Sequence, residues 1–147
     1  SKSDKKYELI YRASRDGDSA KTFHKLCDKH FNLIILIETQ DGLKFGGYTS
    51  YNFKSSPRFK HDNNAFLFSL DQMEIFKIKP ENYALYCCRN VGPSFSNQIL
   101  HVPNDFFKNY GIVGPAGGAF QFKKDYEINN GQKYFKIKEL EVFQALY

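Results

Sequence analysis

The sequence lacks tryptophan, has a single methionine and carries three cysteines among its 147 residues. Its longest uninterrupted apolar run, residues 33–37, is far shorter than the roughly 20 residues that a membrane-crossing helix needs. The N-terminal stretch is polar and charged, so a signal peptide is not expected either. Because the sequence begins at Ser1 rather than at methionine, we expect it to be part of a longer protein.

The few cysteines exclude a disulfide-based fold. Cys87 and Cys88 are adjacent and pair only through a strained ring, and Cys27 stands alone. Reduced thiols in the cytoplasm are therefore expected, with the nucleus and mitochondria as alternatives.

Aromatic residues, by contrast, are abundant. The 15 phenylalanines and 10 tyrosines make up an aromatic content of 17%, and such rings favour strands. A hydrophobic content of 41% is enough for one core. The net charge of +5 suits an acidic protein partner or a nucleic acid.

Local patterns predict an α+β, β-rich fold. Asp18 or Ser19 is expected to cap a short amphipathic helix over residues 20–29, and Asp41-Gly42 predicts a two-residue hairpin loop. We expect a turn at 13–18, a polar loop up to residue 64, a helical turn at 104–110 and a loop at 111–118. Strands are predicted at residues 7–12, 31–38, 44–51, 65–70, 75–78, 83–88, 99–102, 120–127 and 133–143. These elements predict a sandwich of two antiparallel sheets flanked by short helices, in a monomer with a flexible lead-in (1–6) and one domain (7–147).

The last predicted strand contains a change of alternation. A bulge near Lys138 would bring the apolar residues on both sides of it to the core and turn Glu139 and Glu141 outward. Their carboxylates would lie about 7 Å apart, and paired carboxylates can share acid and base roles in hydrolysis. No nucleophile accompanies them, so we favour structure or partner recognition and assign no catalytic residue.

A metal or redox site is poorly supported. His24, Cys27 and His30 follow one another at three-residue spacing, which places at most two ligands on one helix face. Cys87 and Cys88 are further donors, or redox-sensitive thiols if one has a low pKa. We expect no metal and no cofactor.

A basic group with interleaved aromatic residues lies near the middle of the chain. Four residues that are basic or titratable, Lys54, Arg58, Lys60 and His61, are interleaved with the phenylalanines at positions 53 and 59. Such a group can hold a phosphate backbone and stack bases, although a solvated surface is the more common interpretation.

Five blocks along the chain, taken in order, carry a resemblance. They are YRASRDGDSAKTFHKLCD (11–28), LKFGGYTS (43–50), HDNNAFLFSL (61–70), VGPSF (91–95) and KELEVFQ (138–144). In this order they resemble the blocks of the TLDc domain, the module of the oxidation-resistance proteins. The positions that match the first two blocks are Ser14, Arg15, Gly17, Ser19, Gly46 and Gly47. The segment 96–98 lacks the glycines and the acid common in relatives, and residues 104–124 match poorly.

The resemblance implies a sandwich of two antiparallel sheets, protection against oxidative stress and binding to the vacuolar proton-pumping ATPase (V-ATPase). It implies no agreed catalytic reaction, and it makes Glu139 and Glu141 a candidate functional pair. We therefore expect a non-enzymatic protein-interaction domain. The alternatives are a nucleic-acid-binding stress regulator that uses the basic group, and an enzyme or peroxide scavenger that uses the glutamates or Cys87 and Cys88.

Overall fold

The computed structural model describes residues 6–146. Residues 1–5 of the predicted lead-in lie outside the described residues, and Lys6 is the first residue of strand β1. Within residues 6–146 no helix is long and apolar enough to cross a membrane.

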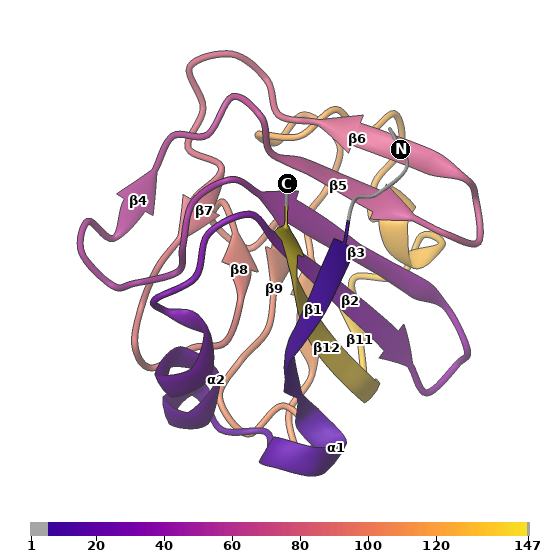
Figure 1. Cartoon of the computed structure of the whole chain (residues 1–147). Coiled ribbons are helices and arrows are strands. Elements are labelled where there is room, and N and C mark those ends of the chain that lie inside the picture. Colours follow the sequence, from indigo (N-terminus) through magenta and orange to yellow (C-terminus); the bar gives the residue numbers. More distant parts are fainter. Residues whose placement is uncertain (1–5, 147) are drawn as a thin grey trace.

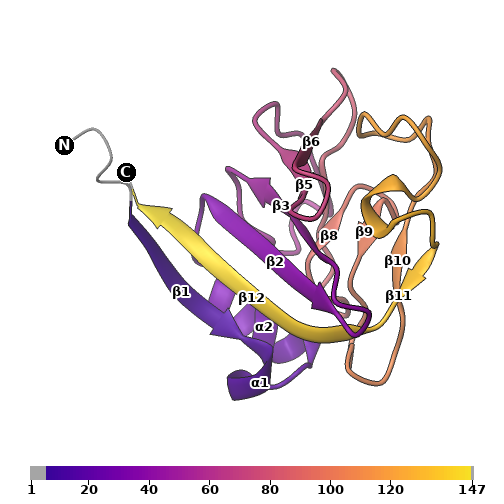
Figure 2. The ribbon, with the colours of Figure 1, turned by 90° about the vertical axis from the view of Figure 1, so that its right-hand side faces the viewer.

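The architecture is the predicted β-sandwich (Figures 1 and 2). One layer, here called the long-stranded sheet, consists of β1 (Lys6–Arg12), β12 (Ile137–Leu146), β2 (Leu33–Thr39), β3 (Lys44–Thr49), β5 (Phe66–Ser69) and β6 (Glu74–Lys77) in spatial order. The other, the short-stranded sheet, consists of β11 (Tyr134–Phe135), β10 (Gly111–Val113), β9 (Leu100–His101), β8 (Ser94–Phe95), β7 (Leu85–Tyr86) and β4 (Phe59–Lys60). All the pairings are antiparallel.

Two short helices, α1 (Ala13–Asp16) and α2 (Ala20–Cys27), lie at one end of the sandwich (Figure 1). A 3₁₀ turn, η1 (Glu127–Asn129), precedes β11. The predicted cap of α2 is confirmed, because the Ser19 side chain accepts a bond from the backbone N–H of Thr22. Phe23 and Cys27 then face the core along one side of α2.

Phenylalanine rings fill the space between the two sheets. Phe45 of β3 meets Phe135 of β11 edge to face, with ring centroids 5.1 Å apart. Phe95 of β8 meets Phe53 at 5.7 Å in the same geometry. Edge-to-face pairs at these distances add to the free energy gained from burial alone. The abundance of phenylalanine in the sequence thus becomes an aromatic core.

Both adjacent glycines of β3 stand where neighbouring atoms come too close for a side chain, and at Gly47 the neighbour belongs to the other layer. β3 pairs in regular register with β2 and β5, so there is no bulge at Gly46-Gly47. A Cβ atom on Gly47 would lie 2.6 Å from the Phe95 ring, and one on Gly46 would collide with the carbonyl oxygen of Ile35. A glycine pair inside a strand is typical either of a bulge or of a neighbour packed close against the backbone, and here it is the close packing that is observed.

The predicted bulge in the last strand is present. The register of β12 against β2 shifts between Ile137 and Glu139. Ile137 and Leu140 are buried on the two sides of this shift, whereas Glu139 and Glu141 are only partly buried. Because a bulge inserts one extra residue, the apolar side chains on both sides of it point toward the core.

Several local predictions were wrong. The segment 120–127 forms no strand, only a bridge from Phe120 to Ile78 and the start of η1. The turn expected at 13–18 contains α1, and the hairpin loop after β2 is longer than two residues. Turns occupy residues 104–108, within the segment where a single helical turn was expected. Strands β4 and β10 lie in segments expected to be loops, and β8 lies where no strand was predicted. Two or three residues are too few to show an alternation of apolar and polar side chains.

Candidate functional site

The glutamate pair of β12 holds the start of the domain in place. Arg12 Nε donates to Glu141 Oε2 at 2.9 Å, and Nη2 of the same guanidinium forms an ion pair with this oxygen at 2.8 Å. Glu139 Oε1 accepts the backbone N–H of Ser14 at 3.0 Å. The two carboxylates therefore fasten the end of β1 and the first turn of α1 to β12.

A third glutamate lies beside this pair. Glu38 of β2 stands opposite Glu139 in the register of β2 and β12. Within residues 6–146 no hydrogen bond or ion pair engages the Glu38 carboxylate. A depression of about 200 Å³ unites the three acids, and we call it the acidic hollow; it is lined by Leu36, Glu38, Lys44, Leu70, Glu139 and Glu141.

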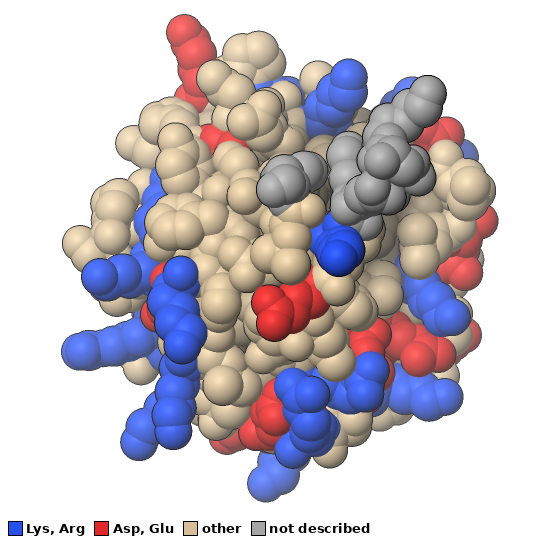
Figure 3. Space-filling model, viewed as in Figure 1, with Lys and Arg blue, Asp and Glu red and all other residues tan. Residues whose placement is uncertain are grey.

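An apolar depression adjoins the acidic hollow on the same outer face of the long-stranded sheet. This outer apolar hollow measures about 330 Å³ and is lined by Tyr7, Ile34, Leu36, Phe68, Leu70 and Phe143. Leu36 and Leu70 belong to both hollows. Figure 3 looks onto this face, where uncharged residues occupy most of the middle and lysines and arginines gather at the lower and left edges.

The predicted basic group lies on another part of the surface, around β4, and only part of it is free. The Lys60 ammonium donates to the carbonyl and the side-chain oxygens of Asn52, at 3.1 and 2.7 Å, and to the carbonyl of Lys54 at 2.8 Å. Burial lowers the pKa of Lys60 below its usual value. Lys54 and Arg58 are exposed. The ring of His61 stacks on Tyr83 with centroids 4.2 Å apart.

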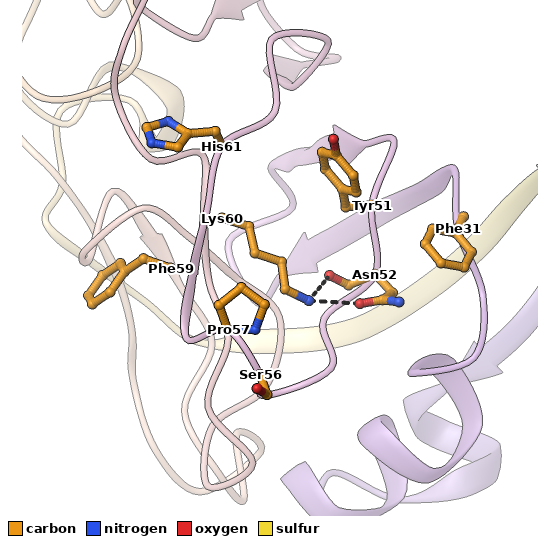
Figure 4. A pocket seen from close by; sticks show the side chains of 8 residues that line it. All are labelled: Phe31, Tyr51, Asn52, Ser56, Pro57, Phe59, Lys60 and His61. Atoms are coloured by element: carbon orange, nitrogen blue, oxygen red, sulfur yellow. Dashed lines mark hydrogen bonds between the residues drawn. The ribbon is translucent and has the colours of Figure 1, made fainter.

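The basic group borders a depression in the surface, here called the aromatic pocket. This aromatic pocket measures about 430 Å³ (Figure 4). The lining residues come from three segments of the chain: Phe31 follows α2, Tyr51 and Asn52 follow β3, and residues 56–61 contain β4. It is lined by Phe31, Tyr51, Asn52, Ser56, Pro57, Phe59, Lys60 and His61.

The histidines and cysteines considered for a metal do not come together. Burial alone would lower the pKa of His24, but its Nδ1 bond to Asp28 at 2.7 Å and its Nε2 bonds to the carbonyls of Cys88 and Val91, both at 2.9 Å, raise the pKa above 6.5. Through these bonds His24 ties α2 to the segment 88–91. His30 bonds instead to Gln144. Across residues 6–146 no three His, Cys, Asp or Glu side chains are arranged to hold a metal ion.

Two of the three thiols are buried and have a raised pKa. Cys27 and Cys87 are buried and Cys88 is half-buried, all unpaired. Burial raises the pKa of Cys87 to about 11 and that of Cys27 further still. The thiolate is the reactive form of cysteine, so these two buried thiols are inert at neutral pH.

Sequence reasoning missed one organising residue, Asp62. Its buried carboxylate accepts bonds from the Thr49 hydroxyl at 2.7 Å, from the N–H and hydroxyl of Ser50 at 2.7 and 2.8 Å, and from the N–H of Asn64 at 3.0 Å. Asp62 thereby joins the end of β3 to the segment that carries the aromatic pocket. The surrounding sequence HDNN looks like an ordinary polar loop, and nothing in it marks the aspartate as buried.

The matching positions of the first sequence block (residues 11–28) lie in and around α1. The backbone of Ser14 bonds to Glu139, Arg15 pairs with Asp16 at 2.9 Å on the surface, and Gly17 ends α1 with a φ of 98°. Tyr11 donates its hydroxyl to the Gly17 carbonyl. The first and last blocks of the sequence therefore meet at the junction of β1, α1 and β12. The family model of the TLDc domain matches residues 1–145.

The chain belongs to the TLDc family. This TLDc domain is also similar to proteins named "MTOR-associated protein MEAK7" over a 68-residue stretch, which is 44% of this chain. The identity is 32% for the protein from Gallus gallus and 31% for those from Xenopus laevis and Mus musculus. The matched stretch spans 14% of each relative's length.

Proposed function

We propose that this TLDc domain is a non-enzymatic protein-interaction domain that docks on its partner through the outer face of the long-stranded sheet. The observation that carries the proposal is the outer apolar hollow, which is lined only by apolar and aromatic side chains, with Leu70 47% exposed. Contiguous apolar surface on a protein marks an interaction site more often than a chance feature.

The neighbouring acids define the chemistry of the partner. The Glu38 carboxylate has no partner within residues 6–146, whereas the other two glutamates of the acidic hollow already have partners in the domain. The occupant that fits both hollows is an amphipathic segment with apolar side chains and an adjacent lysine or arginine. Its cation would meet Glu38 and set the orientation of docking more than the affinity.

We further propose the peripheral subunits of the proton-pumping V-ATPase as the partner, and resistance to oxidative stress in the cytoplasm as the setting. Membership of the TLDc family supports this proposal. The name of the MEAK7 relatives supports a second candidate, an mTOR-containing complex. The engaged glutamates and the raised pKa of the buried thiols support a role without catalysis.

An affinity purification from a lysate of the source cells, read by mass spectrometry, tests the proposal. The tagged wild-type domain is expected to recover peripheral pump subunits, and the E38A/L70A variant is expected to lose them. Neither of these side chains makes a hydrogen bond or ion pair within residues 6–146, so the variant should keep its fold. The melting temperature of the variant, measured by circular dichroism, checks that it is folded.

The matched control is Y110A/E74A, which removes an exposed ring and a carboxylate outside both hollows. It is expected to recover the subunits as the wild type does. Equal recovery by E38A/L70A would overturn the proposed face. Absence of pump subunits from the wild-type sample, with mTOR-complex subunits in their place, would favour the second candidate.

A further inference from the structure

We propose that the aromatic pocket is a second docking site, which binds an acidic peptide segment by taking up one of its aromatic or aliphatic side chains. This site lies around β4 and shares no lining residue with the two hollows on the long-stranded sheet. The inference is therefore independent of the function proposed above.

The pocket offers aromatic ring surface to a ligand. Phe31 and Tyr51 are each 47% exposed and Phe59 is 39% exposed. They come from different segments of the chain and line one depression of about 430 Å³ (Figure 4). A volume within the usual range of ligand pockets, with rings on its walls, suits the side chain of an inserted residue.

Interactions within the domain hold these walls in position. The Phe59 ring packs against Tyr83 and Tyr86, with centroids 5.5 and 5.1 Å apart. The three bonds of the Lys60 ammonium tie β4 to the segment after β3. A site that is already ordered loses less conformational entropy when a ligand binds.

The charge at the rim selects an acidic ligand. Lys29, Lys54 and Arg58 are exposed, and each lies within two residues of a lining residue. Figure 3 shows lysines and arginines along the left and lower edges, where β4 and α2 lie in Figure 1.

The neighbouring acids do not cancel this charge. Asp28 is bonded to His24, and Asp62 is buried among its donors. Lys29, Lys54 and Arg58 therefore remain available to acidic side chains of a ligand.

A peptide fits this arrangement better than a nucleic acid does. A lysine ammonium has three donors, and those of Lys60 are all used inside the domain. The three exposed cations at the rim are fewer than the roughly 6–10 phosphate contacts of a protein that binds the nucleic-acid backbone strongly. An apolar side chain flanked by carboxylates needs only one pocket and a few cations.

Selection from a phage-displayed library of random peptides tests the inference and requires no named partner. Selection on the wild-type domain is expected to enrich peptides that combine acidic residues with one aromatic or aliphatic residue. A fluorescein-labelled peptide of the enriched sequence is then titrated by fluorescence anisotropy. The variants F31A and R58E are each expected to weaken its binding about tenfold, as truncation of an interface anchor typically does.

The matched controls are Y110A, an exposed aromatic residue outside the pocket, and K123E, which changes the net charge as R58E does. Both are expected to bind the peptide as the wild type does. Failure to enrich any acidic sequence, or equal binding by F31A, would overturn the inference. Binding of a single-stranded oligothymidine probe more tightly than the selected peptide, with a steep dependence on salt, would also overturn it and make the pocket a nucleic-acid site.

Discussion

Replacing Asp62 by alanine should destabilise the domain strongly, because the Asp62 carboxylate is buried among its hydrogen-bond donors. The substitution removes the acceptor of four hydrogen bonds, and the Thr49 hydroxyl that donates one of them is fully buried. A hydrogen bond to a charged group contributes about 1.5–3 kcal/mol, and a buried donor left without a partner costs about 1–3 kcal/mol.

The four contributions do not add, because three of the donors are only partly buried and can bond to water once the carboxylate is gone. We therefore expect the free energy of unfolding to fall by about 3 kcal/mol, of which about 2 kcal/mol comes from the buried Thr49 hydroxyl. For a domain of this size such a loss lowers the melting temperature by roughly 6–12 °C.

Urea denaturation of wild type and D62A, followed by circular dichroism, measures the difference. The control is D71A, because Asp71 accepts a single exposed bond, from the N–H of Lys44 at 2.6 Å. We expect it to cost less than about 1 kcal/mol. A loss of less than about 1 kcal/mol in D62A, or an equal loss in both variants, would refute the argument that the buried Thr49 donor decides the cost.

Three further predictions concern individual residues. The pKa of His24 is raised in the folded state, so the imidazolium stabilises the fold fully below pH 6.5, and this contribution is lost as the pH rises through the folded pKa. The free energy of unfolding of wild type, measured by urea titration, should therefore exceed that of H24Q by less and less as the pH rises. A difference that grows with pH would contradict this assignment. A Cβ on Gly47 would meet Phe95 at 2.6 Å, so G47A should lower the free energy of unfolding by about 1–3 kcal/mol, and an unchanged melting temperature would show that the two sheets can separate without cost. Ellman's reagent should titrate Cys88 first in the native protein and the other two thiols only after denaturation, since both of these are buried with raised pKa; three equal native rates would argue against that burial.

Much of the long-stranded sheet could be predicted from the sequence because its signals are local. The apolar run after Asn32 predicts a buried strand, and the change of alternation near Lys138 predicts the bulge. The outward placement of Glu139 and Glu141 follows from that bulge. Each of these inferences depends only on which residues follow one another along a strand.

The short-stranded sheet and the sites depend on partners far apart in the sequence. Strands of two residues such as β4 and β8 exist because a neighbouring strand supplies their hydrogen bonds, and no periodicity reveals them. The sequence alone indicates that Lys60 is a free surface cation, but its ammonium donates hydrogen bonds to oxygens of Asn52 and Lys54. The Glu38 carboxylate became a candidate only once pairing with β12 had placed it beside the glutamate pair.

Glu139 and Glu141 combine a structural role with their place in the acidic hollow. Both carboxylates fasten Arg12 and the backbone of Ser14, so an E139A/E141A variant would lose bonds that hold β1 and α1 to β12. Loss of partner binding in that variant would mix destabilisation with recognition. Glu38 has no such bonds within residues 6–146, and it is therefore the acid to change first.

The most direct test of the central claim is the affinity of the purified domain for the purified peripheral part of the V-ATPase, measured by biolayer interferometry. We expect saturable binding by wild type, the same affinity for Y110A/E74A, and binding at least about tenfold weaker for E38A/L70A, the loss expected when an apolar anchor and its neighbouring charge are removed. Binding that is absent in wild type, or that survives unchanged in E38A/L70A while the variant remains folded, would contradict the claim that this face docks the domain on the pump.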